Sequence, residues 1–319
     1  MIEQMTRREL LTSLLLPAGF AVASRMVGAQ TRRHRKTQYA APGPVKLDRV
    51  GISTWSFHNL FFATRQPAGP DFPEKLVLLD VPAAIADRYK VHNLEFVARH
   101  FASTEPAYLQ ALKSNLLSAR SRLINLDVDT RELESGGGLS DAAAGPRDAA
   151  IAAVKSWIDI ARQLGARSVS CDPGPADPGN LEVTVDSFRQ LAAYSRSKGI
   201  AVLIENRTAA GASYFDAPVS ICRGVGGTSI GALPGFGDFP DDATRMRDLP
   251  ALFGYAHIIC HATGQKLDAS GNETGFNFQQ CVRIAQKSGF RGIYSVNYEG
   301  EADPYPAVQS VINELLGLL

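Results

Sequence analysis

Short apolar runs alternate with amphipathic stretches along most of the chain. The apolar runs predict β-strands over 49–55, 92–97, 122–128, 167–171, 201–205, 229–233, 255–261 and 292–297. Between them, apolar residues recur at three- and four-residue spacing, which predicts helices over 83–90, 106–121, 147–166, 184–199 and 276–290. Several helices close on a glycine suited to a left-handed C-cap, namely Gly165, Gly199 and Gly289.

Repeated strand–helix alternation favours a parallel sheet with crossover helices. Eight such units over about 270 residues have the size of a closed (β/α)8 TIM barrel. The competing fold is an open doubly wound sheet, which would carry a glycine-rich phosphate loop after its first strand. Here the first strand runs into STWSFHN instead. We therefore predict an α/β protein with one (β/α)8 TIM-barrel domain over residues 47–319.

The N-terminus has the pattern of an export signal rather than of a fold. Arg7 and Arg8 precede an apolar run from Leu10 to about Ala23, and the small-residue end Val27-Gly28-Ala29 follows. This pattern predicts a twin-arginine signal peptide over 1–29 and a linker over 30–46, hence a periplasmic or secreted protein. The run is short for a membrane span, although an uncleaved anchor is the alternative.

Composition narrows the partners. The chain has 319 residues with a formal net charge of +1, and nothing in that balance indicates binding to nucleic acid. The cysteines are widely spaced and form no C-x-x-C pair. A chain this long does not need disulfides to hold its core, so buried thiols are expected.

The last four predicted strands end in polar side chains. Because the carboxyl ends of barrel strands converge on one mouth, Glu205, Asp238, His261 and Glu299 can form a pocket of hard oxygen and nitrogen donors. Such donors suit Mg²⁺, Mn²⁺ or Zn²⁺. Cys260 precedes His261, but neighbours on a strand point to opposite faces, so we assign only the imidazole to the pocket.

Further candidates surround the predicted mouth. Aromatic side chains after the first strand can stack on a sugar face or simply pack the barrel end, and polar groups after later strands can bind hydroxyl, carboxylate or phosphate groups. The substrate-binding candidates are Trp55, His58, His100, Asp172, Arg207 and Asn297. Glu95 on the second strand needs a partner if it lies inside the barrel, and Arg99, His100 and Arg207 are the candidates.

The segments GIAVLIENR, ALPGFGDF, HATGQKLDASGNET and GFRGIYSVNYEG resemble the xylose-isomerase-like TIM barrels, the sugar phosphate isomerase/epimerase superfamily. The resemblance runs from about Val50 to Leu318. It implies one divalent cation held by Glu, Asp, His and Glu from strands five to eight. It also implies that the two Glu residues move protons between adjacent carbons of a ketose or aldose.

The chain departs from that pattern at several positions. Gly235 stands where relatives carry the Asp ligand, Asn297 where they carry the last Glu, and Arg207 where a His is frequent. Asp238 can fold back from its loop, and Glu299 shares a strand face with Asn297 at a shift of roughly 6–7 Å. Both a rebuilt metal site and a metal-free pocket therefore remain open.

The resemblance implies a sugar isomerase or epimerase acting on a ketose, aldose or polyol. Glu205 would abstract a proton beside a carbonyl, and a metal or His261 would polarise the oxygen. Because Asn297 cannot act as a base, the proton would return from Glu299, Asp172 or water. The alternatives are a non-catalytic carbohydrate-binding barrel and a lyase or hydrolase acting on keto-sugars.

Overall fold

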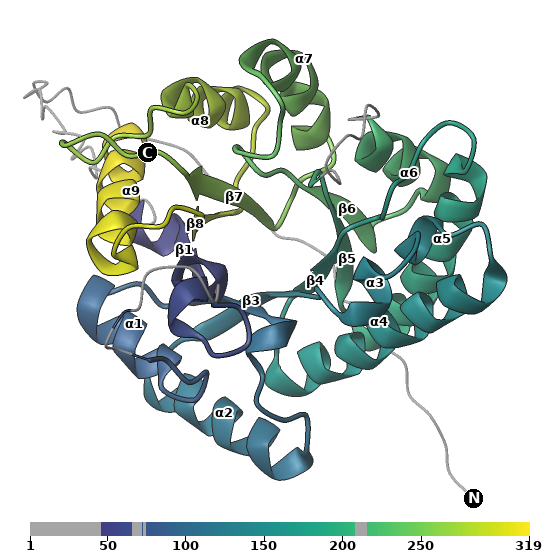
Figure 1. The fold of residues 1–319 in the computed structure, drawn as a ribbon, viewed down its shortest axis with the longest axis horizontal. Coiled ribbons are helices and arrows are strands. Elements are labelled where there is room, and N and C mark those ends of the chain that lie inside the picture. Colours follow the sequence, from purple (N-terminus) through teal and green to yellow (C-terminus); the bar gives the residue numbers. More distant parts are fainter. Residues whose placement is uncertain (1–45, 66–71, 73–74, 208–215) are drawn as a thin grey trace, which may run out of the picture. The chain divides into compact units, whose positions relative to one another are not determined.

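Eight parallel strands form the centre of the computed structural model, which describes residues 46–65, 72, 75–207 and 216–319 (Figure 1). The strands lie in the order β6-β5-β4-β3-β2-β1-β8-β7. Their bounds are β1 Val50–Ser53, β2 Asn93–Val97, β3 Arg122–Asp127, β4 Ser168–Cys171, β5 Ala201–Glu205, β6 Ile230–Leu233, β7 Ile259–Gly264 and β8 Ile293–Tyr298.

The two outer strands of this order meet and close the ring. Gly235, just after β6, forms a parallel bridge with His261 in β7. The Phe236 N–H donates to the His261 carbonyl at 3.1 Å, and the His261 N–H donates to the Pro234 carbonyl at 2.9 Å. Closure of a parallel sheet with helical crossovers confirms the predicted (β/α)8 TIM-barrel fold.

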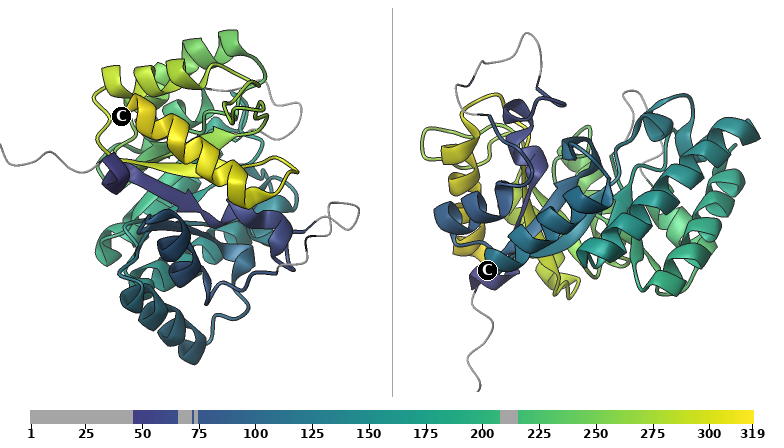
Figure 2. Two further views of the ribbon diagram at one scale, coloured as in Figure 1. Left: turned by 90° about the vertical axis from the view of Figure 1, so that its left-hand side faces the viewer. Right: turned by 90° about the horizontal axis from the view of Figure 1, so that it is seen from below.

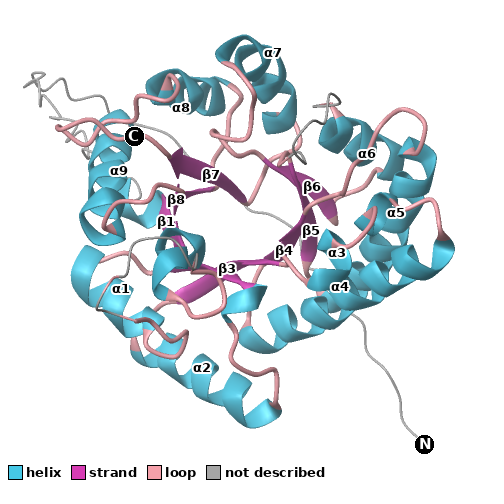
Figure 3. Cartoon of the chain, in the orientation of Figure 1, coloured by secondary structure: helices cyan, strands magenta, loops and turns pink. Residues whose placement is uncertain are grey.

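Helices surround the strands (Figure 3). The α-helices are α1 Val81–Tyr89, α2 Pro106–Ser118, α3 Arg131–Glu134, α4 Ala144–Leu164, α5 Leu181–Lys198, α6 Ala217–Val225, α7 Asp242–Phe253, α8 Phe278–Lys287 and α9 Pro304–Leu318. Short 3-10 helices cover η1 Lys46–Arg49, η2 Thr54–Leu60, η3 Ala98–His100 and η4 Gly138–Ser140. Gly199 ends α5 with a φ of 69°, a left-handed cap that glycine adopts without a steric penalty.

Apolar side chains fill both sides of the strand layer. The inner cluster contains Ile124, Leu203, Leu233 and Ile259, while a much larger cluster lies between the strands and the helices. The outer layer includes α9, which packs on β7 and β8 (Figure 2).

The predicted strands agree with the observed ones except at β7. We predicted 255–261, but β7 begins at Ile259 and continues to Gly264. The earlier residues belong to the turn after α7, where the Tyr255 N–H donates to the Leu252 carbonyl. His261 therefore lies in the middle of its strand rather than at its end.

Some of the predicted segments lie outside the residues that the structure describes. The predicted signal peptide and all of the linker except its last residue lie outside the described residues, as do 66–71 and 73–74. No helix in the described part of the chain has the length and hydropathy of a membrane span.

The cysteines are free and buried, as predicted: Cys171, Cys222, Cys260 and Cys281.

Candidate active site

Polar side chains surround a cavity of about 230 Å³ at the carboxyl ends of the strands. Asp127 ends β3, Glu205 ends β5, and Asp172 and Arg207 follow β4 and β5. All four line the cavity. A larger hollow of about 650 Å³ lies outside the barrel between α1 and α2. The smaller cavity is the better candidate because barrel enzymes build their sites at the strand ends and because buried ionisable groups converge there.

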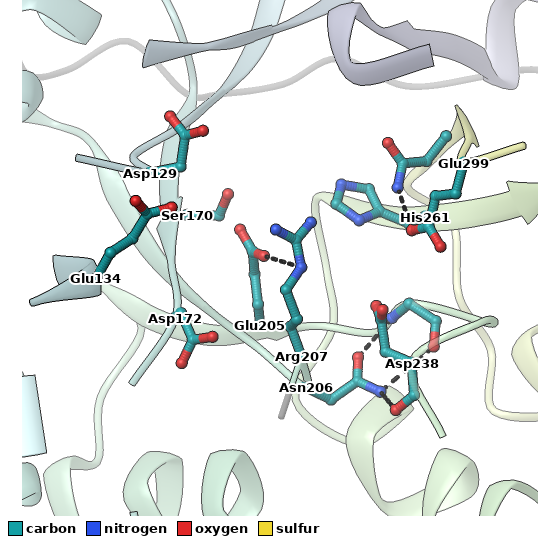
Figure 4. Close-up of polar contacts among 12 residues, drawn as sticks. Asp129, Glu134, Ser170, Asp172, Glu205, Asn206, Arg207, Asp238, His261 and Glu299 are labelled. Carbon is teal, nitrogen blue, oxygen red and sulfur yellow. Dashed lines mark hydrogen bonds and ion pairs between the residues drawn. The ribbon is translucent and has the colours of Figure 1, made fainter. Parts of the chain in front are cut away.

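Glu205 is the most enclosed of these carboxylates, with 2% of the residue exposed. Its Oε2 lies 3.9 Å from Nε of Arg207. Its Oε1 is buried and has no hydrogen-bond partner among the described residues (Figure 4). Leaving a buried carboxylate oxygen unpaired is costly for folding. An unpaired oxygen in a cavity wall therefore indicates a position that meets a ligand.

Two of the aspartates that line the cavity, Asp127 and Asp172, have pKa values above their usual range. Burial, with a further contribution from the charge of Glu205, raises the pKa of Asp127 well above its ordinary value. Burial also raises the pKa of Asp172 to about 6, although the Gly174 N–H donates to its carboxylate at 2.7 Å. A carboxyl group that exchanges its proton near neutral pH can both donate to and accept from a substrate.

Arg207 places a guanidinium among these carboxylates. The side chain points between Glu205 on one side and Asp238 and His261 on the other (Figure 4). Its Cζ lies 5.7 Å from the ring centre of Trp55. Burial alone would lower the pKa of Arg207, but Glu205 and the other carboxylates outweigh burial and raise it. The pocket therefore holds a permanent positive charge.

His261 is paired with a carboxylate inside the barrel. Its Nε2 lies 3.0 and 3.1 Å from the two carboxylate oxygens of Glu95, which also accept hydrogen bonds from Asn125 and Ser295. Burial lowers the pKa of His261, but the charge and hydrogen bond of Glu95 outweigh it and raise the pKa to about 9. The predicted partners of Glu95 were therefore wrong: the chain supplies an imidazole from β7, across the barrel.

Asp238 folds back onto Gly235, as the sequence suggested it can. A Cβ built on Gly235 would overlap Oδ2 of Asp238. The Asn206 side chain fixes this turn, since it accepts from the Gly235 N–H at 2.6 Å and donates to the Asp238 carbonyl at 3.3 Å. The carboxylate of Asp238 thus occupies space that a side chain at position 235 would fill.

We expect Gly235→Ala to displace the Asp238 side chain and to destabilise the fold by about 1–3 kcal/mol, the usual cost of overpacking. The double variant Gly235→Ala/Asp238→Ala removes the overlapping carboxylate and should recover most of that loss. Urea unfolding of the wild type, both single variants and the double variant measures this coupling. Strictly additive costs would contradict the placement of Asp238.

Two amide side chains, those of Asn297 and Gln265, hold the carboxylate of Glu299 just after β8. Nδ2 of Asn297 donates to Oε1 of Glu299 at 3.1 Å, and Nε2 of Gln265 donates to Oε2 at 2.8 Å. Burial, followed by the charge of Asp238, raises the pKa of Glu299 to about 7. We did not predict Gln265, which directly follows the end of β7 at Gly264.

The aromatic and histidine candidates divide into two groups. Trp55 and His58 stack on each other with ring centres 5.1 Å apart, and the contact of Trp55 with Arg207 places it at the site. His100 instead is buried, and its ring nitrogens lie 3.0 Å from the hydroxyls of Thr54 and Thr64. Because both nitrogens are engaged, the assignment of His100 to substrate binding is corrected to a packing role.

The predicted metal ligands do not fit a bound cation in this arrangement. Among the described residues, no group of three or more His, Cys, Asp or Glu side chains is placed to hold a metal ion. Glu205 lines the cavity, whereas Asp238, His261 and Glu299 are not part of its described lining. The guanidinium of Arg207 lies between Glu205 and the other three (Figure 4). We therefore derive no chemistry through a metal.

Comparison with known proteins agrees with the architecture. The profile of the xylose isomerase-like TIM barrel family matches residues 93–315. No protein of curated function matches the chain.

Solved structures share the fold at low sequence identity. A xylose isomerase-like TIM barrel protein from Mycobacterium smegmatis in complex with magnesium is 12% identical, with a TM-score of 0.60 over 85% of this chain and 96% of that one. D-psicose 3-epimerase with D-tagatose from Clostridium cellulolyticum H10 is 13% identical, with a TM-score of 0.59 over 84% and 94%. The probable 3-DHS dehydratase AsbF, involved in petrobactin synthesis, from Bacillus anthracis is 10% identical, with a TM-score of 0.59 over 84% and 98%. At these identities the likeness shows the fold alone.

Proposed function

The chain belongs to the xylose isomerase-like TIM barrel family, and from this premise we propose that it catalyses proton transfer at a carbon next to a carbonyl group. The proposed substrate is a small hydroxylated compound of the carbohydrate type, and the net reaction is isomerisation or epimerisation. Similar folds include an epimerase with a bound ketose and a probable dehydratase, and both names are compatible with removing a proton beside a carbonyl.

The observation that carries this proposal is the free oxygen of Glu205. Oε1 is buried at a cavity wall without a hydrogen-bond partner among the described residues, while Oε2 faces Arg207. A carboxylate with one oxygen oriented and the other unoccupied is suited to accept a proton from a substrate carbon. The cavity of about 230 Å³ lies below the range typical of drug-sized ligands, which suits a substrate the size of a monosaccharide.

The neighbouring side chains supply the other parts of such a reaction. In the proposed sequence, Glu205 removes the proton, and the N–H groups of Arg207 donate to the substrate oxygen on which negative charge develops. Asp172 lines the same cavity and returns a proton or binds a hydroxyl group. Its pKa of about 6, raised mainly by burial, keeps both protonation states accessible near neutral pH.

Solvent exchange tests this function whichever product is formed. The protein is incubated in D₂O with ketohexoses, aldoses and hydroxylated cyclic ketones, and deuterium at the carbon next to the carbonyl is followed by NMR. We expect enzyme-dependent incorporation with at least one of these substrate classes, accompanied by an isomer or epimer. Loss of water instead would indicate a dehydratase, which uses the same first step.

A negative result is also informative. Saturable binding of a sugar without deuterium incorporation would contradict the proposed reaction and favour the alternative of a carbohydrate-binding barrel. Binding is measured on the same samples by calorimetry, so that an inactive preparation is distinguished from an active one given the wrong substrate.

A further inference from the structure

We infer that the guanidinium of Arg207 is the resident cation of this site and stands in the place that the family pattern gives to a divalent metal. A consequence is that the wild-type pocket excludes divalent cations, and that removing this one positive charge opens it to them. This inference concerns the charge at the site, so it goes beyond the proposed proton transfer and does not depend on it.

The first argument is the position of Arg207. The side chain extends from the end of β5 into the space that separates Glu205 from Asp238 and His261 (Figure 4). Its Nε is 3.9 Å from Oε2 of Glu205, and its Cζ is 5.7 Å from the ring centre of Trp55. A cation coordinated by Glu205 together with the other predicted ligands would have to share this space with the guanidinium.

The second argument is the charge around Arg207. Several carboxylates interact electrostatically with it and originate from five different strand ends: Asp127, Asp172, Glu205, Asp238 and Glu299. Five carboxyl groups thus face one guanidinium, and this acidic surrounding would attract another cation if Arg207 were absent.

The third argument is the set of oxygens without partners. Oε1 of Glu205 and Oδ1 of Asn297 are buried and lack hydrogen bonds among the described residues, and their residues are 2% and 1% exposed. These residues stand at the first and last ligand positions of the family pattern. Asp238 fills the space beside Gly235, the second position. Hard oxygen donors thus remain around the guanidinium, and such donors suit Mg²⁺ and Mn²⁺.

The fourth argument concerns His261, the remaining position. Its Nε2 is engaged by Glu95 at 3.0 Å, which orients the ring. In metal sites an equivalent contact of one ring nitrogen with a carboxylate orients the imidazole and leaves the other nitrogen for the metal. Here the orienting contact is kept although the Arg207 side chain lies between His261 and Glu205 (Figure 4). Elements of a cation site therefore persist around an arginine.

A Mn²⁺ titration followed by electron paramagnetic resonance tests the inference. The full-length protein is treated with chelator, dialysed and titrated with Mn²⁺ as wild type, Arg207→Gln, Arg207→Ser and Arg207→Lys. We expect both neutral variants to bind one Mn²⁺ at least about tenfold more tightly than the wild type. Arg207→Lys keeps the charge and should bind as weakly as the wild type. Arg207→Ser is the second neutral variant in case Arg207→Gln does not fold.

Arg247→Gln is the matched control, because Arg247 pairs with Asp248 on the exposed surface of α7. It removes a guanidinium from a carboxylate outside the pocket and should not change Mn²⁺ affinity. Stoichiometric Mn²⁺ binding by the wild type, as tight as in the neutral variants, would overturn the inference. Failure of both folded neutral variants to gain affinity would overturn it as well. The titration measures Mn²⁺ affinity and not turnover, so failure of the proposed reaction leaves this test unaffected.

Discussion

Glu205→Gln is expected to lower the rate of deuterium incorporation by about 10²–10⁴-fold, the range that a general base contributes. Glutamine keeps the size of the side chain but cannot accept the substrate proton. The change also removes a charge that raises the pKa values of Asp127 and Asp172. We therefore expect the melting temperature of the variant to stay the same or rise, so that the activity loss is not a folding defect.

Glu301→Gln is the matched control for this substitution. Glu301 is exposed in the loop after β8 and is not part of the described lining of the cavity. Its replacement should leave the exchange rate within about twofold of wild type, since surface substitutions have small effects. If Glu205→Gln retains exchange while Asp172→Asn abolishes it, the base is Asp172 and our assignment is wrong.

The fold was predictable because burial of both sheet faces produces short apolar runs that are visible in the sequence. The apolar run at 201–205 coincides with β5, and its last residue, Glu205, lines the cavity. The prediction was wrong at β7, where the strand extends to Gly264. The C-terminal half of β7 contains His261 and Thr263, which are polar although they are buried. The apolar pattern therefore stops before the strand does.

The sequence could predict which residues lie at the end of each strand, but not which residues from different strands contact one another. Each strand end points to the mouth by topology, which correctly placed Glu205 and Asp172 at the cavity. The partner of Glu95 was not predictable, since His261 is 166 positions away and meets it across the barrel. Arg207 was predicted at the mouth and lines the cavity, but its surroundings were not predictable: the carboxylates around it come from five strand ends, and no local pattern records that arrangement.

Glu95→Gln is expected to destabilise the protein by about 3 kcal/mol near pH 6. In the folded protein burial opposes the charge of His261, but Glu95 outweighs it and raises the imidazole pKa from 6.5 to about 9. A difference of this size between the folded and unfolded states corresponds to about 3 kcal/mol. Both partners are almost fully buried, so solvent screens the pair little. Glutamine keeps hydrogen-bonding capacity toward Asn125 and Ser295 but removes the negative charge.

The pH dependence identifies the cause. A group whose folded pKa is raised stabilises the fold fully below its unfolded pKa and loses that contribution as the pH rises through the folded value. The cost of Glu95→Gln should therefore shrink between about pH 6.5 and pH 9 and approach the value of the altered hydrogen bonds, about 1 kcal/mol, near pH 10. Urea unfolding at about pH 6 and pH 10 measures it, with the exposed Glu132→Gln as a control expected to change stability by less than about 0.5 kcal/mol. An equal cost at both pH values would mean that Glu95 contributes packing and hydrogen bonds only. In that case His261 would be neutral, and the positive charge of the pocket would come from Arg207 alone.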